Sequence, residues 1–147
     1  MKIILSLGAL VFLLNTATAQ KVKEAEVPKA VMESFNNSFK DVKAEKWEKE
    51  KNGNFEAEFD FNKEEMSASY SADGKLMETE TEIKVSALPA TVSDYIAKNY
   101  PGQKIKEASK IMDDKGTLSY EAEIKKGKED LDLIFDQSGN FLREAKD

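Results

Sequence analysis

The sequence predicts an α+β fold of two tandem repeats, each a helix followed by a four-stranded antiparallel β-meander. Two observations support this prediction. The stretch FEAEFDFNKEEMSASYSADGKLME, beginning at Phe55, returns in altered form from Tyr120 as YEAEIKKGKEDLDLIFDQSGNFLRE. Each stretch alternates apolar and polar residues, as strands with one buried face do, and follows a segment whose apolar residues have helical spacing.

Two anchors define how the repeats align. Val27-Pro28 matches Leu88-Pro89, which lies 61 residues further on, whereas Phe55 matches Tyr120, which lies 65 residues further on. The second repeat therefore contains four additional residues, which we place near 112–119. Two copies of this length are typical of a duplicated supersecondary unit rather than of a solenoid.

Each repeat begins with a predicted helix whose large apolar residues recur every four positions and form one core-facing stripe. These residues are Val31, Phe35 and Phe39, then Val92, Ile96 and Tyr100. Pro28 and Pro89 stand at the predicted helix starts, where a missing amide donor costs nothing and the fixed φ suits the helix. Ser86 is a candidate cap for the second helix, and Pro101-Gly102 ends it.

Four strands follow each helix, separated by turns rich in Asn, Asp and Gly. The predicted turns are Asn52-Gly53, Asn62-Lys63, Asp73-Gly74, Lys126-Gly127 and Ser138-Gly139. The first strand of each repeat is irregular, because Ala44 and Trp47 are three residues apart, as are Ile105 and Ala108. That spacing predicts a β-bulge. Trp47, the only tryptophan, is interpreted as a core residue.

The helices cover one face of the predicted sheet and leave the other face to solvent. On that open face Glu56 and Glu58 occupy positions equivalent to Glu121 and Glu123. We interpret these four carboxylates as the candidate partner-facing surface; the simpler interpretation is a solvated face. We expect a broad polar surface without a pocket, and nothing in the pattern predicts that these carboxylates are buried.

The amino end has the three parts of a secretory signal peptide, over residues 1–19. Lys2 supplies the positive charge, an apolar run over 3–14 follows, and Ala17-Thr18-Ala19 provides the small residues that the peptidase requires. We place cleavage between Ala19 and Gln20. The mature chain is then expected in the bacterial periplasm or outside the cell, without stable membrane insertion. The remaining segments are a polar lead-in over 20–26, repeat 1 over 27–85 and repeat 2 over 86–147.

Composition excludes several classes of function. The 147 residues include 28 acidic and 22 basic ones, a net charge of −6, which disfavours binding to nucleic acids or to an anionic membrane. The chain contains no cysteine and no histidine, which removes thiol nucleophiles, disulfides, Ser-His-Asp triads and most zinc or haem sites. We predict no cofactor and no metal site.

With no histidine or cysteine, carboxylates remain the residues that could bind a metal ion or catalyse a reaction. The segments 71–75 and 136–140 lack the ligand spacing of a calcium loop and are interpreted as turns. A hydrolase that works with carboxylates alone needs a buried acid pair, and the pattern shows none. We therefore predict that the protein is not an enzyme and name no catalytic residue.

The order of these motifs resembles the PepSY-like, β-lactamase-inhibitor-like family, which is common in Bacteroidetes envelopes. The shared features are a signal peptide, a helix opened by [VL]-P, a Trp in the first strand, a [FY]-E-A-E strand and a glycine turn. The resemblance implies a fold similar to the β-lactamase inhibitor protein, whose concave sheet face grips an enzyme. PepSY domains more widely look like protease-propeptide inhibitors. The chain departs from the characterised inhibitor in lacking its cysteines.

We therefore predict an exported, non-catalytic protein-binding module that acts through the open face of the sheet on an unidentified protein partner. The resemblance implies inhibition of an enzyme of the protease or β-lactamase class. The alternative, favoured by the acidic balance, is a structural or small-ligand or cation-binding envelope protein. The sequence identifies neither the partner nor the oligomeric state.

Overall fold

A computed structural model describes residues 19–145 of the chain. The predicted signal peptide lies, apart from Ala19, outside the described residues. The helices are α1 (Lys29–Ser38) and α2 (Ala90–Asn99), with short 3-10 turns η1 (Glu24–Glu26) and η2 (Val85–Ala87). The strands are β1 (Gln20–Val22), β2 (Lys46–Lys49), β3 (Phe55–Phe61), β4 (Glu64–Tyr70), β5 (Leu76–Glu82), β6 (Ile105–Asp113), β7 (Leu118–Lys126), β8 (Glu129–Asp136) and β9 (Phe141–Ala145).

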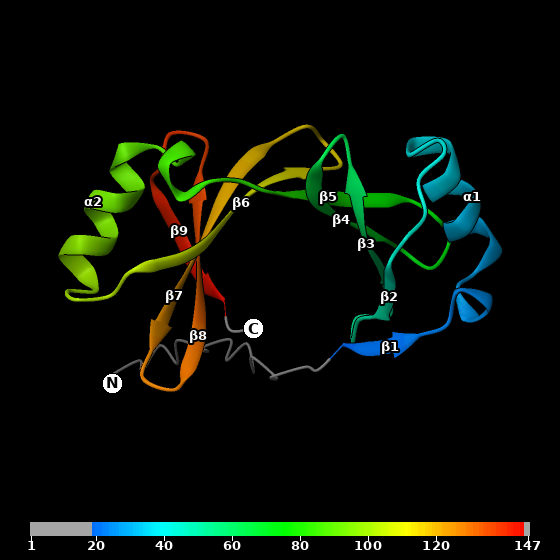
Figure 1. The fold of residues 1–147 in the computed structure, drawn as a ribbon, viewed down its shortest axis with the longest axis horizontal. Coiled ribbons are helices and arrows are strands. Elements are labelled where there is room, and N and C mark those ends of the chain that lie inside the picture. The colour runs from blue at the N-terminus through cyan, green and yellow to red at the C-terminus, as the bar shows by residue number, and fades with distance from the viewer. Residues whose placement is uncertain (1–18, 146–147) are drawn as a thin grey trace, which may run out of the picture.

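The nine strands form one antiparallel sheet in which each strand pairs with its neighbours in sequence, from β1 to β9. The predicted combination of helices with an antiparallel sheet is confirmed. Helix α1 precedes β2–β5, and helix α2 precedes β6–β9. Figure 1 shows the sheet bent into an arch, with α1 and α2 on its outer side. Neither helix of the described chain is long and apolar enough to cross a membrane.

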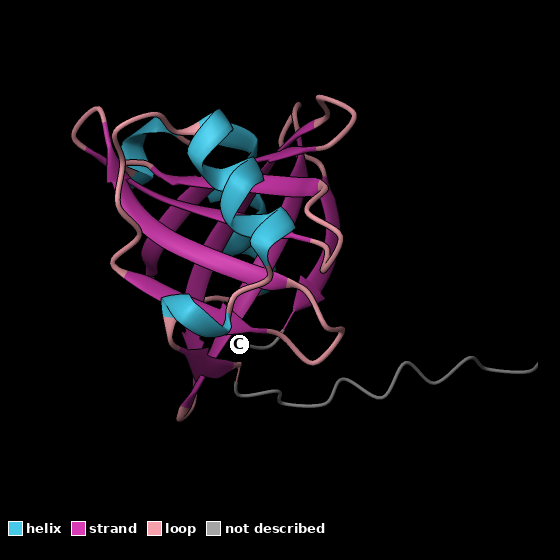
Figure 2. Cartoon of the chain, turned by 90° about the vertical axis from the view of Figure 1, so that its right-hand side faces the viewer, coloured by secondary structure: helices cyan, strands magenta, loops and turns pink. Residues whose placement is uncertain are grey.

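The two helices bury the stripes that the sequence predicts. Val31 and Phe35 of α1 are buried, as are Val92 and Ile96 of α2. Figure 2 shows α1 lying across the strands of the sheet. The predicted helix starts are displaced by one residue, because the prolines stand at the N-cap rather than inside the helix. Ser86 lies in η2 and does not cap α2.

Each helix packs on its own hydrophobic cluster. The cluster beneath α1 is aromatic: the ring of Phe35 lies 5.1 Å from Phe59, 5.4 Å from Trp47 and 6.5 Å from Tyr70, measured between centroids. Trp47 is only 3% exposed, so its core position is confirmed. The cluster beneath α2 contains smaller aliphatic residues, including Ala108, where the first cluster has Trp47. The two helices thus pack against separate parts of one sheet.

The segment 20–26, expected to be a loose lead-in, is ordered into β1 and η1. Val22 pairs with Trp47 and packs against the first cluster, and this apolar contact gives an otherwise polar segment a place in the sheet. The predicted bulge occurs in β6, where the register shifts between Ile105 and Glu107. In the first half Ala44 precedes β2, which starts at Lys46, so that irregularity lies before the strand.

A tight turn ties α1 to the sheet. Gly74, in the turn between β4 and β5, has a φ of +88°. A Cβ added there would lie 2.5 Å from the backbone oxygen of Ala30 in α1. Only glycine allows both the left-handed conformation and this close approach. The turn therefore fixes how α1 sits on the outer face, and leaves the inner face free.

Candidate functional site

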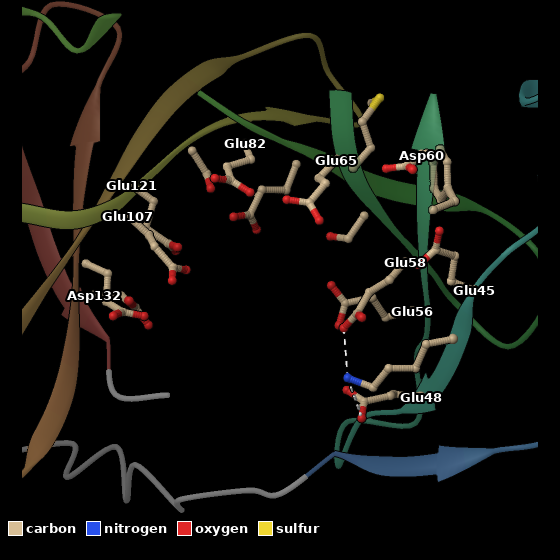
Figure 3. A pocket seen from close by; sticks show the side chains of 17 residues that line it. Glu45, Glu48, Glu56, Glu58, Asp60, Glu65, Glu82, Glu107, Glu121 and Asp132 are labelled. Atoms are coloured by element: carbon tan, nitrogen blue, oxygen red, sulfur yellow. Dashed lines mark hydrogen bonds and ion pairs between the residues drawn. The ribbon is translucent and has the colours of Figure 1, made fainter. Parts of the chain in front are cut away.

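The inner side of the arch encloses a hollow of about 730 Å³, which we call the concave hollow. Residues from β2 through β8 line it, and Figure 3 shows carboxylates reaching into it from several sides. The expectation of a polar surface without a pocket is therefore wrong. The physical reason is curvature, because the twist of successive strands bends a long sheet around the side chains of one face.

The lining of the concave hollow is acidic far beyond the average of the chain. It holds twelve carboxylates and a single basic residue, Lys46, a formal charge of −11. The whole chain carries −6, so the residues outside the lining add up to +5. The carboxylates are Glu45, Glu48, Glu56, Glu58, Asp60, Glu65, Glu80, Glu82, Glu107, Glu121, Glu123 and Asp132.

The period of the strands places the four predicted residues in this hollow. The apolar residues of β3 pack beneath α1, so Glu56 and Glu58 must face inward. The same alternation in β7 turns Glu121 and Glu123 inward. All four line one hollow, whereas the repeat alignment implied only equivalent positions on the open face. They are half-buried rather than freely solvated, which differs from the expectation of an exposed face.

Two lysines are held by carboxylates of the inner face. Lys46 Nζ lies 2.9 Å from Glu58 Oε1 and 3.0 Å from Glu48 Oε1. Hydrogen bonds to these carboxylates, first to Glu58 and then to Glu48, raise the pKa of Lys46.

The second lysine is Lys106 in β6. Its Nζ lies 2.5 Å from Glu123 Oε1 and 3.0 Å from Asp130 Oδ1, and these hydrogen bonds raise the pKa of Lys106. Two of the predicted carboxylates, Glu58 and Glu123, therefore each bind an ammonium group of the chain itself.

The pKa of several carboxyls on this face is raised, with neighbouring carboxylates as a secondary cause. Burial is the main cause for Glu56, partly offset by a hydrogen bond from Ser67. Glu78 is exposed, and its pKa is raised by partial loss of solvation and by the neighbouring carboxylates of Glu80 and Glu50. A hydrogen bond to Glu65 is the main cause for Glu82. Each raised pKa means that the folded sheet favours the neutral acid, or a cation beside the charged one.

Sequence reasoning missed most of the acidic lining. Glu80 and Glu82 of β5 alternate with Thr79 and Thr81, and this period alone could have placed them on the open face. Comparison of the two repeats did not single them out, because they have no matching glutamate in β9. Glu65 and the rest of the lining come together only through the register of the strands.

The hollow has the chemistry of a receptor for positive charge. Among residues 19–145, no three acidic side chains are close enough together to hold a metal ion. The carboxylates are instead spread over seven strands. A hollow lined by one sign of charge concentrates its electric field and draws in groups of the opposite sign.

The chain belongs to the PepSY-like family. The model of this family, described as "Putative beta-lactamase-inhibitor-like, PepSY-like", matches residues 14–78 and 55–143. The two matches overlap and together span nearly the whole chain. No curated protein gives a significant match.

Solved structures from Bacteroides species share the fold. A BLIP-like protein from Bacteroides fragilis is 20% identical, with a TM-score of 0.63 over 81% of this chain and 86% of that chain. A DUF2874 family protein from Bacteroides uniformis is 14% identical, with a TM-score of 0.68 over 81% and 88%. A structure called "putative periplasmic proteins", from Bacteroides eggerthii, is 14% identical, with a TM-score of 0.69 over 82% and 88%.

Proposed function

We propose that the protein is an exported, non-catalytic binding module that holds a protein partner in its concave hollow. The observation that supports this proposal is the concentration of charge: the hollow carries −11 while the rest of the chain carries +5. Charge needed only for solubility would be spread over the whole surface. A hollow of about 730 Å³ is too large for one metal ion and is open enough to receive a protein segment.

Membership of the family supports the same kind of function. The family description suggests binding that blocks a β-lactamase. A protease is the second enzyme class in this proposal, which the wider PepSY resemblance implies. We place Glu56, Glu58, Glu121 and Glu123 among the residues that face the partner. We also propose that repeats 1 and 2 are copies of one unit, since the order of one helix and four strands occurs twice.

Export to the periplasm or beyond is part of this proposal. It is supported by the signal-peptide pattern and by the similar fold of a structure that is called periplasmic. Cleavage after Ala19 would leave Gln20, the first residue of β1, at the amino end. The mature chain would then begin inside the sheet.

Affinity capture with a steric block tests the function. Mature protein, residues 20–147, is used to capture proteins from the envelope and medium of its own organism. Ser67 lies in the hollow between Glu58 and Glu80 in the strand register, so Ser67→Tyr places a bulky ring inside the hollow without changing its charge. Ser93→Tyr, on the exposed side of α2, is the matched control.

We expect one stoichiometric partner that wild type and Ser93→Tyr capture equally and that Ser67→Tyr loses. A partner that Ser67→Tyr captures as well as wild type would contradict binding in the hollow. Thermal melts of both variants check that they are folded, and an assay of the captured enzyme, with and without the protein, tests inhibition.

A further inference from the structure

The concave hollow separates into carboxylates that already hold a lysine and carboxylates that hold none. Lys46 and Lys106 neutralise acids toward the two ends of the sheet. Between them, on β4, β5 and β6, stand Glu65, Glu80, Glu82 and Glu107, which form no ion pair with any lysine or arginine among residues 19–145. We call these four the central carboxylates.

The resident lysines show how this face binds an ammonium group. Each Nζ sits between two carboxylate oxygens at distances from 2.5 to 3.0 Å. Among the central carboxylates, Glu65 and Glu82 line the same part of the hollow, and Glu65 and Glu107 both raise the pKa of Glu82. A cation placed beside such a pair removes the repulsion that a shared proton otherwise relieves.

The spacing of the central carboxylates favours a row of cationic side chains over a single ion. Glu80 and Glu82 are two residues apart on one strand, so their side chains repeat at about 7 Å. An extended peptide laid along the strands has the same repeat for every second side chain. Across the strands the spacing is about 4.8 Å, which lets one lysine or arginine reach carboxylates of two strands.

The hollow also has a route by which a peptide can continue beyond it. A second hollow of about 590 Å³ lies beside the turn between β3 and β4 and the segment that contains η2. Glu65 and Glu82 line both hollows, so the two hollows adjoin at these residues. A segment bound in the concave hollow can leave past these residues and rejoin the body of its protein.

On the basis of the proposed function, we propose that the partner enters the concave hollow as an extended segment rich in lysine or arginine, whose cations pair with the central carboxylates. Charge complementarity selects this occupant: the lining carries −11, and its only cation is already bound. A divalent ion would need a closer group of ligands than residues 19–145 provide.

The test is direct binding of defined probes to the mature protein, measured by fluorescence anisotropy. The probe is a labelled eight-residue peptide in which lysine and serine alternate. The first control probe is the same peptide with acetylated lysines, which carries no side-chain charge. The second is calcium chloride alone, whose binding is measured by calorimetry. The protein variant is the triple substitution Glu80→Gln, Glu82→Gln and Glu107→Gln.

A matched variant separates site binding from general attraction. Glu24→Gln, Glu33→Gln and Asp94→Asn remove the same charge from exposed positions outside the hollow. We expect the central triple variant to weaken binding of the lysine peptide by about 10- to 30-fold, from three ion pairs of modest strength, and the matched variant by less than about 2-fold. Binding should also weaken steeply with salt.

Equal weakening by both variants would overturn the proposal, because attraction would then be non-specific. Tight binding of the acetylated peptide, or of calcium in place of the lysine peptide, would overturn it as well. If the lysine peptide fails to bind while Ser67→Tyr still abolishes capture of a protein, the proposal of a cationic segment is overturned. The proposal that the hollow binds a protein then remains. If capture is insensitive to Ser67→Tyr, the proposed function itself fails.

Discussion

Substituting Gly74 by alanine should destabilise the protein through two separable effects. The first is backbone strain, since an L-residue held at positive φ costs about 1–2 kcal/mol. The second is the clash of the new Cβ with the backbone of Ala30, at 2.5 Å from its oxygen and 2.7 Å from its carbonyl carbon. A helix backbone cannot rotate away, so the turn itself must move, which costs about 1–3 kcal/mol more, as overpacking does.

Gly102 provides a matched control for the strain alone. Its φ is +81°, close to the +88° of Gly74, but a Cβ built there meets nothing within 4 Å. Gly102→Ala should therefore lose only the stability that backbone strain costs, without the cost of the clash. We expect Gly74→Ala to unfold with about 1–3 kcal/mol less stability than Gly102→Ala. That difference lowers the melting temperature by roughly 3–12 °C more for a domain of this size.

Thermal and urea denaturation followed by circular dichroism measure both variants under the same conditions. Equal losses of folding stability for the two variants would contradict the predicted clash, because they would mean that the turn does not press against α1. A loss near zero for Gly102→Ala would instead contradict the stability cost assigned to positive φ. The control thus tests the backbone strain separately from the clash with Ala30.

Three further predictions concern the inner face and the core. Loss of solvation raises the pKa of the half-buried Glu56 and of the exposed Glu78 above the ordinary value of about 4.5, so both carboxyls cost stability when charged. A thermal melt series from about pH 7.5 to 5 should show the melting temperature rising, and a fall over this range would contradict the shifts. Phe35→Ala should cost about 3–5 kcal/mol in urea unfolding, because the ring is 1% exposed and lies against the aromatic cluster; a cost under about 1 kcal/mol would mean the cluster refills the space. The hydroxyl of Tyr70 is buried without a hydrogen-bond partner among the described residues. Burial raises the pKa of Tyr70, the nearby Ser38 lowers it in part, and the result is a pKa of about 12. Tyr70→Phe should therefore leave stability unchanged or raise it by up to about 1 kcal/mol, and a clear loss in the same urea assay would reveal a partner for the hydroxyl.

The elements of this fold could be predicted because their signals are local. The stripe of Val31 and Phe35 needs only the helical period, and the strand β3 needs only the alternation of apolar and acidic residues. β1 could not be found in this way, since its polar residues gain a place in the sheet only through Val22 beside Trp47. The bulge predicted between Ala44 and Trp47 is absent from β2 for a different reason, because the strand begins only at Lys46.

The candidate site was only partly within reach of the sequence. Glu56, Glu58, Glu121 and Glu123 could be assigned to one face because equivalent strands share one phase. That they face a hollow, and that Lys106 reaches carboxylates of β7 and β8, depends on contacts between residues far apart in the chain.

Which residues turn inward and which turn outward follows from the sequence alone, because side-chain direction along a strand alternates whatever the surroundings. That the inward residues meet depends on the tertiary structure. Twist accumulates over nine paired strands and bends the sheet, and the bend brings separate rows of carboxylates around a single hollow. A chain with a net charge of −6 therefore carries a local charge of −11, because alternation turns these twelve carboxylates inward and curvature brings their rows around one hollow.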